Sequence, residues 1–258
     1  MRTEEDEEFL REVLRTSKER IKFISEGVNL WRSRLGYSGS PIFDEKGRHI
    51  DDEPVPYPQK RMKPRTDRAR EGRVNPRGIP VLYLSTTKDA AMSEVRPWLG
   101  SYVSCGIFTV RRRLSIVDFS EHHDSGHIFY FDEPSEQEKE KAVWTHIDQA
   151  FSIPTTLGDD VDKYAPTQLL AELFKREGYD GIAYGSMFSK AGHNIALFNP
   201  DDAEMTYCEL HQVSSVDFTF EDRHTPYWVG DDGKATRIVV EDVFPVPPAT
   251  GEDGSGAH

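Results

Sequence analysis

Three stretches of the chain have apolar residues spaced as on one face of a helix: 3–25, 133–151 and 166–178. The first has an acidic first turn, which favours a helix N-terminus. The second places Pro134 in its first turn, and the third stops at Gly178. A shorter helix is expected to begin after Thr86 or Thr87, either of which can cap it, and to end before Pro97.

Shorter apolar runs predict strands at 28–36, 79–85, 101–110, 114–119, 181–186, 193–198, 206–220 and 237–243. The link of residues 111–113 is too short for a parallel crossover, so the strands on either side of it are expected to form a hairpin. Helices and hairpins mix without a regular strand–helix repeat. The sequence therefore predicts an α+β fold with a mixed or antiparallel sheet core flanked by helices. Neither GxGxxG nor GxxxxGK[ST] occurs, which argues against a doubly wound fold.

Residues 36–80 differ from the rest, because seven prolines interrupt any long element and predict an irregular loop. The second half of this segment is basic and contains Lys60, Arg61, Lys63, Arg65, Arg68, Arg70, Arg73 and Arg77. Such a run is either a solvated loop, which is the more common case, or a local anion site in an otherwise acidic protein.

Composition narrows the class of protein. The 258 residues suit one large domain with additions, and 36% hydrophobic with 30% charged residues is typical of a soluble globular chain with polar loops. The net charge of −13 opposes a nucleic-acid partner. No apolar run approaches the roughly 18 residues that span a bilayer, and the acidic N-terminus is not a signal peptide. Two distant cysteines, Cys105 and Cys208, indicate a reduced cytoplasmic protein.

The stretch GRVNPRGIPVLYLSTTKDAAMSE, residues 72–94, joins an arginine-led loop, a short strand and a helix. On the predicted helix, Glu94 falls on the same arc as Ala90 and Ala91. A carboxylate on an apolar face is costly unless it is paired or hydrogen-bonded. Glu94 is therefore either a functional group with room for a ligand beside it, or a structural residue whose side chain extends to solvent or pairs with an arginine. Arg73 suits a phosphate, although a salt bridge is the more common fate of a lone arginine.

Two other kinds of chemistry are weaker candidates. EHHDSGH, residues 121–127, offers three histidines and an aspartate that could bind a metal, but it reads as a solvated polar loop with no ligand pair on a regular element. The residues around Ser186 lack the second glycine of the GxSxG nucleophile elbow, which argues against a serine hydrolase.

The order and spacing of several blocks resemble the RES domain, a family named for its Arg, Glu and Ser. These blocks are LWRSR at 30–34, EGRVNPRGIPVLYLS at 71–85 and PTQLLAELFKREGYDGIAYGSMFSKAGHNIALFNP at 166–200. The first is similar to the family's opening aromatic–Arg block, and the second to its Gly-Arg-x-Asn-Pro and x-Leu-Tyr-Leu pattern. The spacing of Arg73, Tyr83 and Glu94 also fits. The resemblance covers roughly residues 28–205.

RES proteins are typically toxins of toxin–antitoxin pairs, with a fold like that of ADP-ribosyltransferases and NAD⁺ as substrate. Most degrade NAD⁺ by phosphorolysis or hydrolysis, and a few modify a protein. The resemblance implies cleavage of the nicotinamide–ribose bond through an oxocarbenium-like transition state, which a carboxylate stabilises. Nicotinamide leaves as a neutral group, so no strong general acid is needed.

The same resemblance assigns roles to six residues. Glu94 stabilises the developing positive charge, and Arg73 and Arg32 grip the pyrophosphate. Tyr83 stacks on the nicotinamide ring. Ser186 bonds the ribose or the phosphate, and Asn194 completes the polar wall. No metal or cofactor is implied, with NAD⁺ as substrate and inorganic phosphate as a candidate co-substrate.

The expected organisation is an N-terminal helical extension at 1–27, a RES domain at 28–205 with a long loop at 36–78, strands at 206–244 that pack on the domain, and a disordered tail at 245–258. The resemblance also implies an Xre-like antitoxin partner, and a homodimer is compatible with the sequence. No nucleic-acid or membrane partner is expected. Two alternatives stay open: a mono-ADP-ribosyltransferase acting on a protein, and a module that binds NAD⁺ without turnover. A costly carboxylate at Glu94 argues against pure binding.

Overall fold

The computed structural model describes residues 3–65, 67–123, 133–153, 164–189, 192–220, 227–229 and 235–237. The chain divides into two units, Met1–Val216 and Asp217–His258. The second unit contains a two-stranded hairpin of β11 (Tyr227–Val229) and β12 (Ala235–Arg237). The strand expected at 237–243 lies outside the described residues apart from its first residue, and the tail expected from Pro245 lies outside them entirely.

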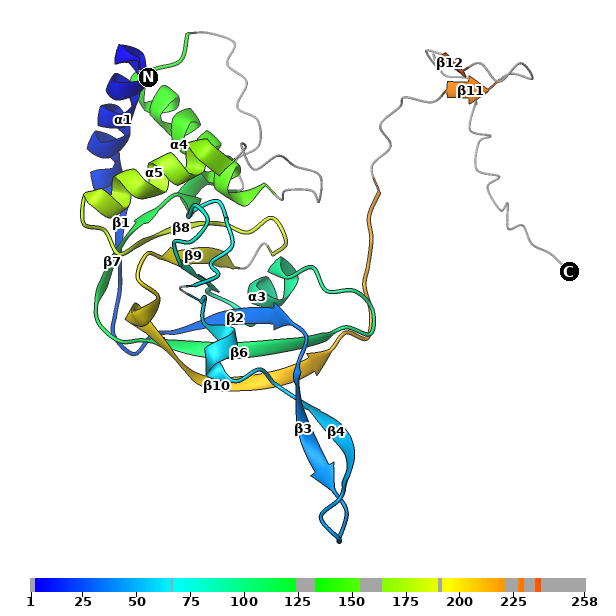
Figure 1. Cartoon of the computed structure of the whole chain (residues 1–258). Helices are drawn as coiled ribbons and strands as arrows, with labels where there is room; N and C mark the ends of the chain where they lie inside the picture. Colours follow the sequence, from blue (N-terminus) through cyan, green and yellow to red (C-terminus); the bar gives the residue numbers. More distant parts are fainter. Residues whose placement is uncertain are drawn as a thin grey trace, which may run out of the picture. The chain divides into compact units, whose positions relative to one another are not determined.

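One eight-stranded sheet organises the first unit (Figure 1). Its strands are β1 (Ile21–Ile24), β2 (Asn29–Leu35), β5 (Leu82–Ser85), β6 (Tyr102–Val110), β7 (Leu114–Asp118), β8 (Gly181–Gly185), β9 (His193–Leu197) and β10 (Ala203–Gln212). They lie in the order β1-β7-β8-β9-β5-β2-β6-β10, and all neighbours are antiparallel except β7 and β8. This mixed sheet, flanked by helices, confirms the predicted α+β class.

The hairpin predicted between β6 and β7 is wrong, because these two strands are not neighbours. β6 pairs with β2 and β7 pairs with β1, so residues 102–118 run antiparallel to residues 21–35 along most of their length. Pairing passes from β2–β6 to β1–β7 at a corner, where Gly27 N donates to the Val110 carbonyl at 2.8 Å. Across the sheet, β5 and β2 are joined by the single pair Trp31 and Ser85. The sequence shows that the link of residues 111–113 is short, but not that the two paired segments, β1–β2 and β6–β7, bend there together.

Helices cover the half of the sheet that contains β1, β7 and β8 (Figure 1). They are α1 (Glu4–Ser17), α4 (Glu136–Ser152) and α5 (Ala165–Arg176). Their apolar faces enclose a core that includes Val13, Phe119, Trp144, Phe151, Phe174 and Ile182. A second core includes Leu30, Met62, Leu82, Phe108, Leu114 and Leu197. The short helix α3 (Lys88–Glu94) lies against β2.

Two predicted helices differ from the structure at their ends. The first ends at Ser17, is followed by a 3-10 turn, η1 (Lys18–Arg20), and gives way to β1 where a helix was expected to continue. Pairing with β7 supplies the backbone hydrogen bonds that a helix would have made. Ser135 caps α4, so Pro134 precedes that helix instead of lying in its first turn. Two further 3-10 turns are η2 (Ser120–His122) and η4 (Pro200–Asp202).

The first part of the segment expected to be irregular is a hairpin of β3 (Ser38–Phe43) and β4 (His49–Val55), followed by the one-turn helix α2 (Gln59–Met62). Pro41 and Pro54 lie within its strands. A two-stranded ribbon has free edges where a missing N–H needs no partner, which explains how it tolerates proline. Within the described residues, no helix is long and apolar enough to cross a lipid bilayer.

Candidate active site

Glu94 is the last residue of α3, a helix capped at its start. Thr87 caps its start, and the Thr87 side chain accepts a hydrogen bond from Ala90 N at 3.2 Å. Ala90 and Ala91 are buried, as the helical spacing predicted. The glutamate is only partly buried, so its carboxylate reaches a space beside the sheet and stays accessible.

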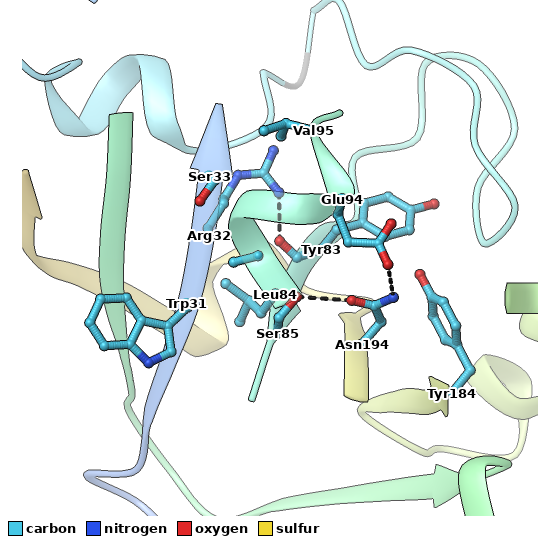
Figure 2. Close-up of a pocket in the computed structure, with 11 residues that line it drawn as sticks. Trp31, Arg32, Ser33, Tyr83, Leu84, Ser85, Glu94, Val95, Tyr184 and Asn194 are labelled. Atoms are coloured by element: carbon cyan, nitrogen blue, oxygen red, sulfur yellow. Dashed lines mark hydrogen bonds between the residues drawn. The ribbon is translucent and has the colours of Figure 1, made fainter. Parts of the chain in front are cut away.

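Two neutral side chains hold this carboxylate. Ser186 Oγ donates to Glu94 Oε1 at 2.8 Å, and Asn194 Nδ2 donates to the same oxygen at 2.6 Å. Ser85 Oγ donates in turn to Asn194 Oδ1 at 2.9 Å, which fixes the orientation of the amide (Figure 2). No ion pair to Glu94 occurs among the described residues. Among these residues the structural-arginine interpretation of Glu94 is therefore not supported.

These residues border a pocket of about 280 Å³. Four of the six residues singled out from the sequence line it: Arg32, Tyr83, Glu94 and Asn194. Ser186 joins the site through its hydrogen bond to Glu94.

Sequence reasoning missed two aromatic residues of the pocket wall, Trp31 and Tyr184. Trp31 directly precedes Arg32, and Tyr184 lies two residues before Ser186, a spacing that places both side chains on the same side of an extended chain. Figure 2 shows the hydroxyl end of Tyr184 directed toward Glu94. Burial raises the pKa of Tyr184 well above its ordinary value, and the neighbouring Tyr83 and Glu94 add to the shift. Tyr184 is therefore a neutral hydroxyl in the pocket wall.

Arg32 is anchored by backbone oxygens. Its Nε donates to the Met62 carbonyl and its Nη1 to the Tyr83 carbonyl, both at 2.7 Å. Burial, reinforced by the nearby charge of Arg34, lowers the pKa of Arg32 to about 10. A desolvated guanidinium beside a second cation favours an anion in the adjacent pocket.

The Gly-Arg-x-Asn motif surrounds the tyrosine hydroxyl. Tyr83 donates to Asn75 Oδ1 at 2.7 Å and accepts from Val74 N at 3.1 Å. Burial raises the pKa of Tyr83 to about 12. A Cβ on Gly72 would lie 2.6 Å from this hydroxyl, so the motif requires glycine there. The Tyr83 hydroxyl is thus hydrogen-bonded to the Gly-Arg-x-Asn turn, while Tyr83 remains part of the pocket wall.

Arg73 contacts the end of a helix, and its expected role in gripping the pyrophosphate stays a prediction. Its guanidinium donates to the carbonyl of Phe151, near the C-terminal end of α4, and the residue lines neither this pocket nor the next one described below. A cation suits the end of a helix, where carbonyl groups lack partners.

A second pocket, of about 530 Å³, adjoins the first and shares Arg32, Ser33, Tyr83 and Val95 with it. Its wall also contains four arginines. Arg34 comes from β2, and Arg65, Arg68 and Arg70 come from the basic segment. The basic segment thus contributes three arginines to a pocket wall that also includes Glu71.

The charges of this second pocket are only partly neutralised. Arg65 forms a double hydrogen bond with Asp67, at 2.9 and 2.7 Å. Arg34, in contrast, donates to the carbonyl of Arg61, and its pKa is lowered by burial and by the charges of Arg61 and Arg70. Cations that repel one another at the rim of a pocket attract an anionic ligand.

The histidine-containing loop is described only as far as His123, and residues 124–127 lie outside the described residues. His123 Nδ1 lies 2.5 Å from Asp148 Oδ2. In the part of the chain that the structure describes, no group of three or more His, Cys, Asp or Glu side chains is placed to hold a metal ion.

The fold and the site together define an α+β protein in which a carboxylate, held by neutral donors, borders a pocket that adjoins an arginine-rich one. A family model described as the RES domain matches residues 50–221, and the chain belongs to the RES domain family. The match begins after the LWRSR block and extends through β10, whereas the resemblance read from the sequence covered 28–205.

Among solved structures, one similar chain belongs to the crystal structure of the M. tuberculosis MbcT–MbcA toxin–antitoxin complex. The identity is 14%, the alignment covers 78% of this chain and 92% of that chain, and the TM-score is 0.42. A comparison with curated proteins gives no match.

Proposed function

We propose that this protein is a toxin-like enzyme that cleaves the nicotinamide–ribose bond of NAD⁺, as an NAD⁺ phosphorylase or glycohydrolase. The observation that carries the proposal is the Glu94 carboxylate, held by Ser186 and Asn194 without an ion pair among the described residues. A carboxylate left without a counter-ion can stabilise the positive charge that develops on the ribose as nicotinamide departs.

The two pockets divide the substrate. The nicotinamide riboside half occupies the pocket beside Glu94, where the ring of Tyr83 offers a face for stacking. The pyrophosphate extends toward the second pocket, with Arg32 at the boundary between the two. The hydrogen bonds from Ser186 and Asn194 reach one carboxylate oxygen, so the other is available to the ribose.

The acceptor that completes the reaction is phosphate or water. Arg34 and Arg70 line the second pocket, and no described carboxylate forms an ion pair with either of them. This surplus of cations favours phosphate as the second substrate, with ADP-ribose 1″-phosphate as the product. Unrestrained turnover would deplete NAD⁺ in the cytoplasm, which is why a cognate antitoxin, of the Xre-like kind, is proposed as the partner.

Transfer of ADP-ribose to a protein is the second candidate function. It is favoured by large apolar side chains exposed on the loops that follow the two site residues Glu94 and Ser186. Trp98 and Leu99 are 66% and 58% exposed, and Met187 is 55% exposed. An acceptor protein would need such a surface close to the site.

The test is nicotinamide release from NAD⁺ by the purified full chain, with and without inorganic phosphate, beside Glu94→Gln. The ADP-ribose product is identified by its mass. Release that requires phosphate would indicate a phosphorylase, and release without it a glycohydrolase. Release that Glu94→Gln leaves unchanged would refute the proposed site. No release in either buffer would refute NAD⁺ degradation and direct the search to a modified protein.

A further inference from the structure

Two side chains of one helix form hydrogen bonds with the backbone N–H and carbonyl of Gly185. Asp148 Oδ1 accepts a hydrogen bond from Gly185 N at 2.7 Å, and Ser152 Oγ donates to the Gly185 carbonyl at 2.9 Å. Both side chains come from the last turns of α4. The residues on either side of the glycine are Tyr184, in the pocket wall, and Ser186, the hydrogen-bond donor to Glu94.

The aspartate is itself held by a histidine, and we call His123, Asp148 and Ser152 the clamp. Asp148 Oδ2 lies 2.5 Å from His123 Nδ1, and the two side chains are 1% and 16% exposed. A carboxylate buried this deeply is stable only with such partners. A Cβ on Gly185 would overlap the His123 ring, so the imidazole packs directly on the glycine backbone. The geometry thus explains why glycine stands between Tyr184 and Ser186.

The clamp contacts the chain at the residue where β8 ends its pairing in the sheet. The last register pair between β8 and β9 is Gly185 with His193, so Ser186 is the first residue beyond the strand. Its hydroxyl must nevertheless be placed accurately, because it donates to Glu94 Oε1 at 2.8 Å. Hydrogen bonds from α4 to the preceding residue replace the missing strand pairing.

We propose that His123, Asp148 and Ser152 are positioning residues, which set the hydroxyl of Ser186 and, through it, the carboxylate of Glu94. This inference rests on the proposed function of the Glu94 site. The hydrogen bond of Arg73 to the Phe151 carbonyl ties the same turn of α4 to the Gly-Arg-x-Asn motif. The helix end thereby connects both sides of the pocket.

The first test compares Ser152→Ala and His123→Ala with Thr145→Val as control, in the full chain. Thr145 is buried on the same helix, and among the described residues its hydroxyl bonds only within that helix, to the Lys141 carbonyl. Each clamp variant should lower the kcat for nicotinamide release by about tenfold, as expected for losing a hydrogen bond that orients a reacting group, with KM changed by less than about twofold. The control should retain its kcat.

A double-mutant cycle separates positioning from general damage. In a Ser186→Ala background, the clamp variants should cause no further loss of kcat, because the hydroxyl they orient is absent. Losses of equal size in both backgrounds would overturn the proposal. His123→Gln should recover part of the activity, since its amide can donate to Asp148.

Hydrogen exchange of the 181–188 segment, measured by mass spectrometry, tests the clamp independently of turnover. Exchange should be faster in Ser152→Ala and His123→Ala than in the wild-type protein, and unchanged in Thr145→Val. If the wild-type protein releases no nicotinamide, the proposed function fails and exchange alone decides the clamp. Unchanged exchange in both clamp variants would overturn it, whether or not the protein is active.

Discussion

Replacing Glu94 with glutamine removes one charge from the site and almost nothing else. The glutamine Oε1 can accept the same two hydrogen bonds, from Ser186 Oγ and Asn194 Nδ2. Two unit charges about 4 Å apart interact by about 4 kcal/mol at an effective dielectric constant of about 20. The transition state carries only part of a charge, so we expect a loss of about 2–4 kcal/mol, or about 30- to 1,000-fold in kcat.

Folding should hardly change, because the volume and both hydrogen bonds are retained. The free energy of unfolding in urea should stay within about 1 kcal/mol of the wild-type value. Asp89→Asn is the matched control, since it removes one negative charge from an exposed position of the same helix, and its kcat should be unaffected. Steady-state release of nicotinamide measures both variants. A kcat for Glu94→Gln within twofold of the wild type would show that the charge plays no part in the reaction.

Three further outcomes follow from the structure. Gly72→Ala should destabilise the chain by about 1–3 kcal/mol in urea unfolding, because a Cβ would lie 2.6 Å from the Tyr83 hydroxyl; a neutral result would mean that the turn moves freely. Arg32→Gln should raise the dissociation constant for NAD⁺ more than Arg73→Gln in calorimetric titrations, since only the former residue lines the pockets; the reverse order would return the anchor role to Arg73. Hydrogen bonds from Lys88 and His211 lower the pKa of Glu209 to about 2. The contribution of Glu209 to the free energy of unfolding is therefore complete above about pH 4.5 and is lost as the pH falls through 2. In Glu209→Gln, the free energy of unfolding should fall less steeply with decreasing pH over this range.

The regular elements and the place of Glu94 on one face of its helix could be predicted from the sequence because they depend on local patterns. Helical spacing placed Glu94 on the apolar arc of α3, and the structure bears this out with buried Ala90 and Ala91 beside it. The resemblance added Ser186 and Asn194, which the structure brings to the same carboxylate oxygen. These contacts join residues 92 and 100 positions apart, a distance that no local pattern reports.

What the sequence could not predict depends on non-local pairing. The bent ribbon of β1–β2 and β6–β7 is decided by which strands pair at the corner, since a short link alone is equally consistent with a hairpin. The β3–β4 hairpin was hidden by prolines, which normally argue against strands and are tolerated here at free edges. Spacing along the chain likewise said nothing of the contact between His123 and Asp148, which lie on separate elements.

The conflict between motif and geometry is sharpest at the arginines. A motif can contain residues that bind the ligand and residues that shape the pocket wall, and both kinds have the same appearance in a sequence. Here the Gly-Arg-x-Asn turn uses Gly72 and Asn75 to enclose the Tyr83 hydroxyl, while Arg73 donates to the Phe151 carbonyl near the end of α4. Arg32, from a separate block, is the arginine that borders both pockets. In a chain with a net charge of −13, the arginines that line these pockets support the proposal that an anionic substrate binds there.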